Sequence, residues 1–252
     1  MYNLFRSTRE WRAEVFVETQ KIAPTLPYKP SEKMRIDPGY KPVKLHANTP
    51  ILFSKEDTLI AAKRLQDAGH NPLILNFAND KRPGGGVHSG AGAQEESLFR
   101  RTNLCVTLLP AFYPIKDNEG LYTPEATTFR DTEDNACKRI ELWTGAFSTV
   151  PGLFHPPVGG DNRLLPRDVA RLETKIRMIC QMGAKKGHDV LLLGALGCGA
   201  WQNPPTHVAE IFRYVLAEYD GVFKSILFAI MDRDGSRNYG DFMRVFQRPA
   251  GV

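Results

Sequence analysis

The stretch LNFANDKRPGGGVHSGAGAQEESLFRR, residues 75–101, decides the fold. An apolar strand ends in it at Phe77, a run of glycines follows, and a helix begins near Gln94. The consecutive glycines Gly84–Gly86 allow backbone conformations that other residues avoid, and they let a ligand approach the chain closely. Their N–H groups, with the N-terminus of the following helix, suit a ribose or phosphate oxygen. This strand–loop–helix unit predicts an α/β fold with a ligand site at the ends of its strands.

A second unit of the same kind is LLLGALGCGAWQNPP, residues 191–205. Its strand runs into Gly194, Gly197 and Gly199, and a helix is predicted after Pro205. The pattern is typical of a loop that cradles a phosphate, but it has neither the Lys and Ser/Thr of a P-loop nor the G-x-G-x-x-G spacing. Nucleoside-triphosphate hydrolysis and NAD(H) redox chemistry are therefore disfavoured. One glycine-rich turn can join a strand to a helix without binding anything, but two on one sheet favour a site.

Short apolar strands alternate with helical patterns on either side of these loops. Strands are predicted at residues 43–47, 73–77, 146–150, 190–195 and 225–230. Helices are predicted after Asp57, from Val169 and from Val208, where apolar residues recur at helical spacing. Continuous apolar strands with helices between them indicate a largely parallel sheet that is covered on both faces.

The N-terminal part of the chain has a different character. Trp11, Val15 and Ile22 have helical spacing, and a series of prolines then interrupts the chain. We expect a helical extension and linker over residues 1–41, followed by one domain over residues 42–252.

The composition is that of an ordinary globular protein: of 252 residues, 42% are apolar and 24% charged. The net charge is +5, but Lys and Arg are scattered, so an anionic small ligand is favoured over sequence-specific nucleic-acid binding. The four cysteines form no C-x-x-C pair, which argues against a disulfide framework and a structural zinc site. No apolar run approaches the ~18 residues of a membrane span, and the first residues lack the apolar segment of a secretory signal. We expect an intracellular monomer, cytoplasmic or, in a eukaryotic cell, nuclear.

The run Gln94-Glu95-Glu96 carries the chemistry. Carboxylates in the first turn of a helix are favoured by the helix dipole by about 0.3–1 kcal/mol, which explains the acidity but not the long glycine approach. A carboxyl group that faces a sugar beside a phosphate-binding loop is what cleavage of a glycosidic bond requires.

Three glycines, seven residues and then Gln-Glu-Glu resemble the signature of poly(ADP-ribose) glycohydrolases. The strings NFAN, GAGAQEE and GALGCGAWQNPP resemble the shorter, microbial-type members, over roughly residues 42–247. The resemblance implies a three-layer macrodomain-like α/β fold, a mixed sheet flanked by helices. It implies hydrolysis of the ribose–ribose O-glycosidic bond of poly(ADP-ribose), mainly from the chain terminus, with release of ADP-ribose. The expected partners are the polymer, ADP-ribose and ADP-ribosylated proteins, in the reversal of ADP-ribosylation and the DNA damage response. No metal ion or other cofactor is expected.

The resemblance also implies roles for single residues. Glu96 is the catalytic acid/base, and Glu95 holds ribose hydroxyls. The implied ligand-binding residues are Asn79, Gly84, Gly85, Gly86, Gln94, Gly197, Cys198, Gly199, Ala200, Trp201 and Phe228. The 197–201 loop would wrap the diphosphate with backbone N–H groups, and Phe228 would stack on adenine.

Several of these residues have a second interpretation. Asn79 is also typical of a turn after a strand, and Phe228 of the core. Cys198 could be a thiol nucleophile, which would need a partner such as His88 or His207.

Other acidic residues and other functions have to be weighed too. Asp57 is either the N-cap of its helix or an acceptor for the adenine amine. Asp131, Glu133, Asp134 and Asp161 are interpreted as residues of solvated loops and not as a metal site. The alternative functions are hydrolysis of mono-ADP-ribose from a protein or nucleobase, and a non-catalytic ADP-ribose-binding macrodomain. Binding alone does not require paired acids, which disfavours the second.

Overall fold

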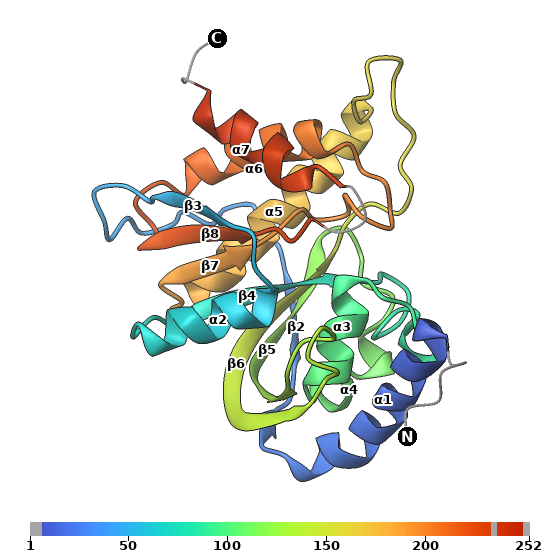
Figure 1. The fold of residues 1–252 in the computed structure, drawn as a ribbon. Coiled ribbons are helices and arrows are strands. Elements are labelled where there is room, and N and C mark those ends of the chain that lie inside the picture. The colour runs from blue at the N-terminus through green and yellow to red at the C-terminus, as the bar shows by residue number, and fades with distance from the viewer. Residues whose placement is uncertain (1–6, 233–235, 249–252) are drawn as a thin grey trace.

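The computed structural model describes residues 7–232 and 236–248, and its centre is one mixed sheet (Figure 1). The eight strands have the order β1-β5-β6-β4-β7-β8-β3, with β2 also paired to β5. They are β1 (Tyr28–Lys29), β2 (Glu32–Arg35), β3 (Ile51–Ser54), β4 (Pro72–Ala78), β5 (Glu119–Arg130), β6 (Arg139–Pro151), β7 (Val190–Leu193) and β8 (Ser225–Ala229). Neighbours from β6 to β3 are parallel, whereas β5 is antiparallel to β6, β1 and β2. The expectation of a largely parallel sheet thus holds for only part of it, and the mixed sheet that the resemblance implies is confirmed.

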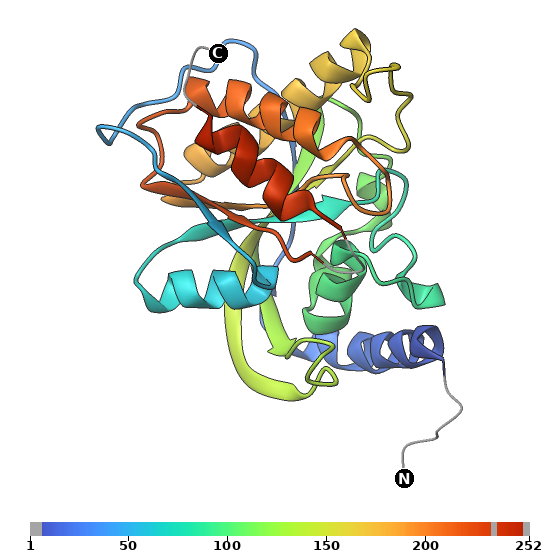
Figure 2. The ribbon, with the colours of Figure 1, turned by 45° about the horizontal axis from the view of Figure 1, so that its top comes forward.

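Helices cover both faces of the sheet and make the three expected layers (Figures 1 and 2). The helices are α1 (Thr8–Ile22), α2 (Thr58–Asp67), α3 (Gln94–Arg101), α4 (Leu104–Thr107), α5 (Pro166–Lys185), α6 (Pro205–Glu218) and α7 (Asn238–Gln247), with short 3-10 turns at Ala23–Thr25, Val87–Ser89 and Pro110–Phe112. Side chains of α5, α6 and α7 form one buried cluster with the sheet, and side chains of α1 to α4 form the other. Local signals explain several helix starts, because Asp57 caps α2 and a proline opens both α5 and α6.

Side chains alternate between the two faces of a strand, and this explains why the central strands are apolar throughout. In β4, Leu73 and Leu75 contribute to the cluster under α5 to α7, while Ile74 and Ala78 contribute to the opposite cluster. A strand between two helical layers must bury both of its faces, so it shows a continuous apolar run.

Two expectations about strands were wrong. The predicted strand at residues 43–47 does not form, and Val43 and Leu45 are exposed. The edge strand beside β8 is β3 instead, because its residues pair in parallel register with Ile226 to Ala229. The long strand β5 was missed because polar residues and Pro124 interrupt its apolar pattern.

The N-terminal segment adds to the same sheet. Residues 28–35, expected to be linker, form β1 and β2 on β5. Helix α1 packs against α3, with Phe16 lying near Phe99 at a ring separation of 6.3 Å. Helix α1 therefore contacts α3, the helix that follows the glycine-rich loop of residues 84–92.

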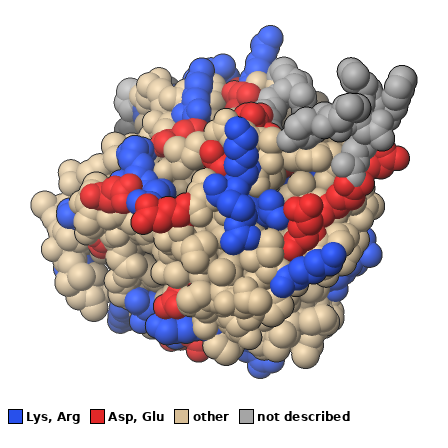
Figure 3. All heavy atoms as spheres, turned by 60° about the horizontal axis from the view of Figure 1, so that its bottom comes forward, with Lys and Arg blue, Asp and Glu red and all other residues tan. Residues whose placement is uncertain are grey.

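The surface shows mixed charge. On the face shown in Figure 3, Lys and Arg side chains alternate with Asp and Glu side chains, without a wide patch of one sign. Among the residues that the structure describes, no helix combines the length and the apolar character that a bilayer crossing needs.

Candidate active site

A cavity of about 630 Å³ opens where several strands of the sheet end. It is lined by Phe77 of β4, Gly152 after β6, the loop after β7, residues 229–231 at the end of β8, the beginnings of α2 and α3, and by Arg12, Thr132, Glu133 and Asn238. A cavity at the carboxyl ends of parallel strands is the usual ligand site of such sheets, and its volume is in the range of small-molecule pockets.

The glycine-rich loop lies directly on the two glutamates. A Cβ atom on Gly85 would lie 2.6 Å from Oε1 of Glu96 and 3.3 Å from Oε2 of Glu95. Gly85 also has a φ of +51°, a conformation that side chains disfavour. The N–H of Gly86 donates to Oε1 of Glu96 at 2.9 Å. Glycine is therefore required here by close contact with the carboxylates as well as by the backbone.

Glu95 is held by the protein through both of its oxygens. Oε1 accepts a hydrogen bond from Nδ2 of Asn76 at 3.3 Å, and Oε2 accepts one from the N–H of Asn79 at 2.7 Å. Burial raises the pKa of Glu95 to about 8, and repulsion from the Glu96 carboxylate adds to the rise. Glu95 thus fastens the first turn of α3 to β4 and to the loop that follows it.

Glu96 differs because one of its oxygens is free. Its side chain is buried, and Oε2 has no hydrogen-bond partner among the described residues. A buried polar atom without a partner is costly and uncommon, and it is explained when a ligand supplies the partner.

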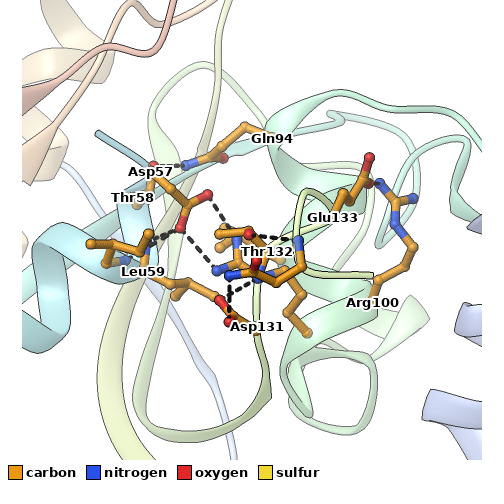
Figure 4. Close-up of polar contacts among 12 residues, drawn as sticks. Asp57, Thr58, Leu59, Gln94, Arg100, Asp131, Thr132 and Glu133 are labelled. Carbon is orange, nitrogen blue, oxygen red and sulfur yellow. Dashed lines mark hydrogen bonds and ion pairs between the residues drawn. The ribbon is translucent and has the colours of Figure 1, made fainter. Parts of the chain in front are cut away.

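Gln94 joins α3 to β4 through its side-chain amide. Its Oε1 accepts from the N–H of Phe77 at 2.9 Å, and its Nε2 donates to the carbonyl of Leu75 at 2.7 Å. A longer contact of 3.4 Å reaches Oγ1 of Thr58 (Figure 4). The side chain therefore extends the hydrogen bonding of β4 and fixes where α3 begins, while also lining the cavity.

The loop after β7 presents backbone amides to the cavity. Gly197, Gly199, Ala200 and Trp201 all line it, and their N–H groups donate to no acceptor in the described part of the chain. Cys198 was wrongly expected to join them, because its N–H donates to the carbonyl of Ala195 at 3.1 Å and it does not line the cavity. Four neighbouring free amides form a site for an anion.

Among the residues that the structure describes, the surroundings of Cys198 do not support a thiol nucleophile. Burial strongly raises the pKa of its thiol, which disfavours the reactive thiolate. Nδ1 of His207 accepts the N–H of Leu164 at 2.8 Å, and the His88 ring packs edge-on against Phe16 at 5.0 Å. Both histidines that sequence reasoning offered as partners are thus engaged elsewhere.

Phe228 lies in the core, so the prediction that it stacks on adenine was wrong. Its side chain is fully buried, and its ring stacks on Phe53 at 5.2 Å. The remaining sides of the ring contact Phe212, Phe242 and Phe246. The residues that line the cavity at this end of β8 are Ala229, Ile230 and Met231.

The other predicted residues lie beside the cavity and not in its wall. Asn79 makes the turn that was its alternative interpretation, because Oδ1 accepts from the N–H groups of Lys81 and Arg82. The three glycines and the two acids follow this turn, and the cavity is not lined by them. Glu96 nevertheless lies in the same helix as Gln94 and Ser97, which do line the cavity.

The cavity wall contains two ion pairs that sequence reasoning did not find. Arg101 binds both oxygens of Asp57 at 2.8 and 2.9 Å. Asp57 also caps α2, where it accepts a hydrogen bond from the N–H of Leu59 (Figure 4). Although burial acts to raise it, the Arg101 guanidinium holds the pKa of Asp57 below its ordinary value. Arg12 binds Glu133 at 2.8 Å.

Glu133 was expected in a solvated loop, and that was wrong. Its side chain is only 10% exposed and also pairs with the buried Arg100 (Figure 4). The Arg101–Asp57 pair joins residues 44 positions apart in the sequence, and the Arg12–Glu133 pair joins residues 121 positions apart. No local sequence pattern could therefore have shown either pair. No group of three residues suited to hold a metal ion occurs in the described ranges.

Comparisons with known proteins agree with this geometry. The family model for the microbial-type PARG, or poly(ADP-ribose) glycohydrolase, catalytic domain matches residues 13–131. The structure is similar to that of poly(ADP-ribose) glycohydrolase from Thermomonospora curvata, with 29% identity, a TM-score of 0.80, and coverage of 94% of this chain and 100% of that one. A structure of that enzyme bound to the inhibitor ADP-HPD has the same identity and TM-score, with coverage of 94% and 99%. The enzyme from Deinococcus radiodurans in complex with ADP-ribose has 25% identity and a TM-score of 0.66, with coverage of 96% and 93%. No curated protein sequence matches.

Proposed function

We propose that this chain, which belongs to the microbial-type poly(ADP-ribose) glycohydrolases, hydrolyses the ribose–ribose O-glycosidic bond of poly(ADP-ribose) and releases ADP-ribose, mainly from the chain terminus. The observation that carries the proposal is the buried, unpartnered Oε2 of Glu96 in the first turn of α3. Gln94 and Ser97 of the same helix line the cavity, together with the residues of the loop after β7 whose amides are free. ADP-ribosylated proteins that carry the polymer are the proposed macromolecular partners.

The terminal ADP-ribose unit occupies the cavity in this proposal. Its diphosphate accepts hydrogen bonds from the amides of Gly197, Gly199, Ala200 and Trp201, which belong to cavity-lining residues and have no acceptor in the described part of the chain. Its reacting ribose extends beneath the glycine-rich loop toward Glu96. The absence of a side chain at Gly85 leaves room for that contact.

Glu96 performs the proton transfers. Protonated, it gives its proton to the oxygen that leaves the anomeric carbon while positive charge develops at that carbon. As a carboxylate, it then takes a proton from the water that attacks the same carbon, so the carboxyl group is regenerated. The hydrogen bond from Gly86 to Oε1 keeps Oε2 turned toward the leaving oxygen.

Glu95 supports this arrangement and is not the acid. Both of its oxygens are occupied by Asn76 and Asn79, so neither is available to the leaving group. At neutral pH a carboxyl with a pKa of about 8 is largely protonated, so Glu95 is largely uncharged there.

The test compares Glu96→Gln with the matched variant Glu95→Gln. Glutamine keeps the size of the side chain but cannot cycle a proton, so turnover of poly(ADP-ribose) should fall by at least ~10²–10⁴-fold in Glu96→Gln. Glu95→Gln should retain more activity, because an amide oxygen still accepts hydrogen bonds. ADP-ribose affinity, measured by calorimetry, should change less than about tenfold in either variant.

Two outcomes contradict the proposal. If Glu96→Gln turns over polymer at the wild-type rate, Glu96 is not the acid/base. If it loses binding and rate together, Glu96 anchors the ligand or the fold instead.

A further inference from the structure

An exposed aromatic cluster continues from the cavity along the outside of the molecule. Phe154, in the loop after β6, is 59% exposed although it is a large apolar side chain. Its ring meets Trp201 edge-on at 5.6 Å and His155 at 4.7 Å. Since Trp201 lines the cavity, the platform formed by Phe154 and its neighbours begins where the cavity ends.

Two cations lie in the loop after β4, and one of them lies against this platform. Nζ of Lys81 lies 5.6 Å from the centre of the Phe154 ring, and Nε of Arg82 donates to the carbonyl of Gly85 at 3.0 Å. Neither forms an ion pair within the described part of the chain, not even with Asp80, which directly precedes Lys81. The arginines that line the cavity, in contrast, are paired with carboxylates. Unpaired positive charge at this rim is available to an anion.

One short loop ties these cations to the reacting carboxyl group. Asn79 receives hydrogen bonds from the N–H groups of Lys81 and Arg82, and its own N–H binds Glu95. Arg82 then holds Gly85, which lies against Glu96. The loops after β4, β6 and β7, which carry Lys81, Phe154 and Trp201, end at one side of the sheet (Figures 1 and 2).

The rest of the bound polymer must extend out of the cavity on this side. In the proposed reaction the released ADP-ribose fills the cavity, so the sugar on the other side of the broken bond lies outside it, next to the loop of residues 79–86. That sugar belongs to the next ADP-ribose unit, which carries a purine base and a diphosphate.

We propose that Phe154, Lys81 and Arg82 form a subsite for this leaving ADP-ribose unit. Its adenine stacks on the exposed ring of Phe154, and its diphosphate lies against the two cations. Stacking of a base on an exposed aromatic side chain tolerates any sequence and suits a polymer of identical units. The inference rests on the proposed function, because only a polymer places a second unit there.

The experiment compares two substrates that differ only in the leaving group. One is poly(ADP-ribose); the other is an aryl glycoside of ADP-ribose, whose leaving phenol has neither base nor phosphate. Phe154→Ala should lower kcat/KM on the polymer by about tenfold and leave kcat/KM on the aryl glycoside unchanged. Phe154→Leu, which stays apolar without a π face, should show most of the same loss. Lys81→Gln should lower polymer turnover at low salt, with a smaller effect at high salt.

The matched control is Tyr214→Ala, because Tyr214 is an aromatic residue of α6 with a similar exposure of 61%. It should leave both substrates unaffected. A loss in Phe154→Ala that is equal on both substrates would place Phe154 in the cavity or the fold and overturn the subsite. Unchanged polymer turnover in Phe154→Ala would overturn it as well. If the wild-type protein cleaves the aryl glycoside but not the polymer, the proposed function fails, and the leaving-unit subsite falls with it.

Discussion

Replacement of Gly85 by alanine tests whether the glycine-rich loop fixes the catalytic carboxyl group. Gly85 has a φ of +51°, so the methyl group introduces left-handed strain of about 1–2 kcal/mol. The same methyl group would lie 2.6 Å from Oε1 of Glu96, whereas ordinary van der Waals contact begins at 3.4 Å, so the loop or the carboxyl group has to move by about 0.8 Å. That movement breaks the hydrogen bond from Gly86.

A displacement of this size has a large effect on the rate. Misplacing a reacting group by ~1 Å costs about 10²-fold in turnover, so kcat for Gly85→Ala should fall about 10²-fold. The free energy of unfolding should fall by about 1–2 kcal/mol, which lowers the melting temperature by a few degrees in a chain of this length. The assays are polymer turnover and denaturant unfolding of the same preparations.

The control that separates strain from contact is Gly187→Ala. Gly187 has a φ of +74°, but nothing lies within 4 Å of its added Cβ atom. It should lose similar stability and keep wild-type turnover. If Gly85→Ala also keeps wild-type turnover while losing stability, the loop does not hold Glu96 and the reasoning is refuted.

Three further predictions concern the cavity, the second acid and metal ions. Gly199→Val should lower ADP-ribose affinity in calorimetry by at least about tenfold without loss of stability. The reason is that a Cβ atom at Gly199 meets nothing within 4 Å and projects from a cavity-lining residue. Equal affinity would mean that the diphosphate does not lie on this loop. The pKa of the Glu95 carboxyl is about 8 in the folded chain and has its ordinary value of 4.5 in the unfolded chain. The free energy of unfolding should therefore fall as the pH rises from 4.5 to 8, and Glu95→Gln should flatten this slope. Equal slopes for the two proteins in denaturant titrations would contradict the raised pKa. Prolonged treatment with a chelator should leave turnover intact, whereas a loss that magnesium or zinc restores would place the enzyme in another class of hydrolase.

The parts of the fold that could be predicted are those in which local sequence decides local structure. The strand up to Phe77, the glycines and the helix from Gln94 all follow from short-range chemistry, and the structure shows them as predicted. The edge strand could not be predicted in this way. Val43 and Leu45 have high strand propensity, but pairing with β8 goes to residues 51–54, because strand formation depends on partners far along the chain.

The same distinction holds for the candidate site. The family resemblance implied that the backbone amides of residues 197–201 bind the ligand, and four of these five amides are free, whereas that of Cys198 is not. The prediction for Phe228 failed because side-chain alternation along a strand shows that neighbouring residues face opposite sides of the sheet, but not which side meets the ligand. The pairs of Arg101 with Asp57 and of Arg12 with Glu133 were invisible because they depend on tertiary contacts.

These pairs explain how a basic protein can bind an anionic ligand mainly through neutral groups. Breaking a largely buried pair by drawing its arginine to a phosphate would strand a carboxylate, at a cost of about 3–5 kcal/mol. The amides of Gly197, Gly199, Ala200 and Trp201 need no such rearrangement, because they are already free and fixed by the loop. In the proposed complex, fixed dipoles therefore bind the diphosphate more favourably than the nearby cations can. The positive charge that remains unpaired lies at Lys81 and Arg82, outside the cavity, where it can act on a longer anionic chain without competing for the unit that is about to be released.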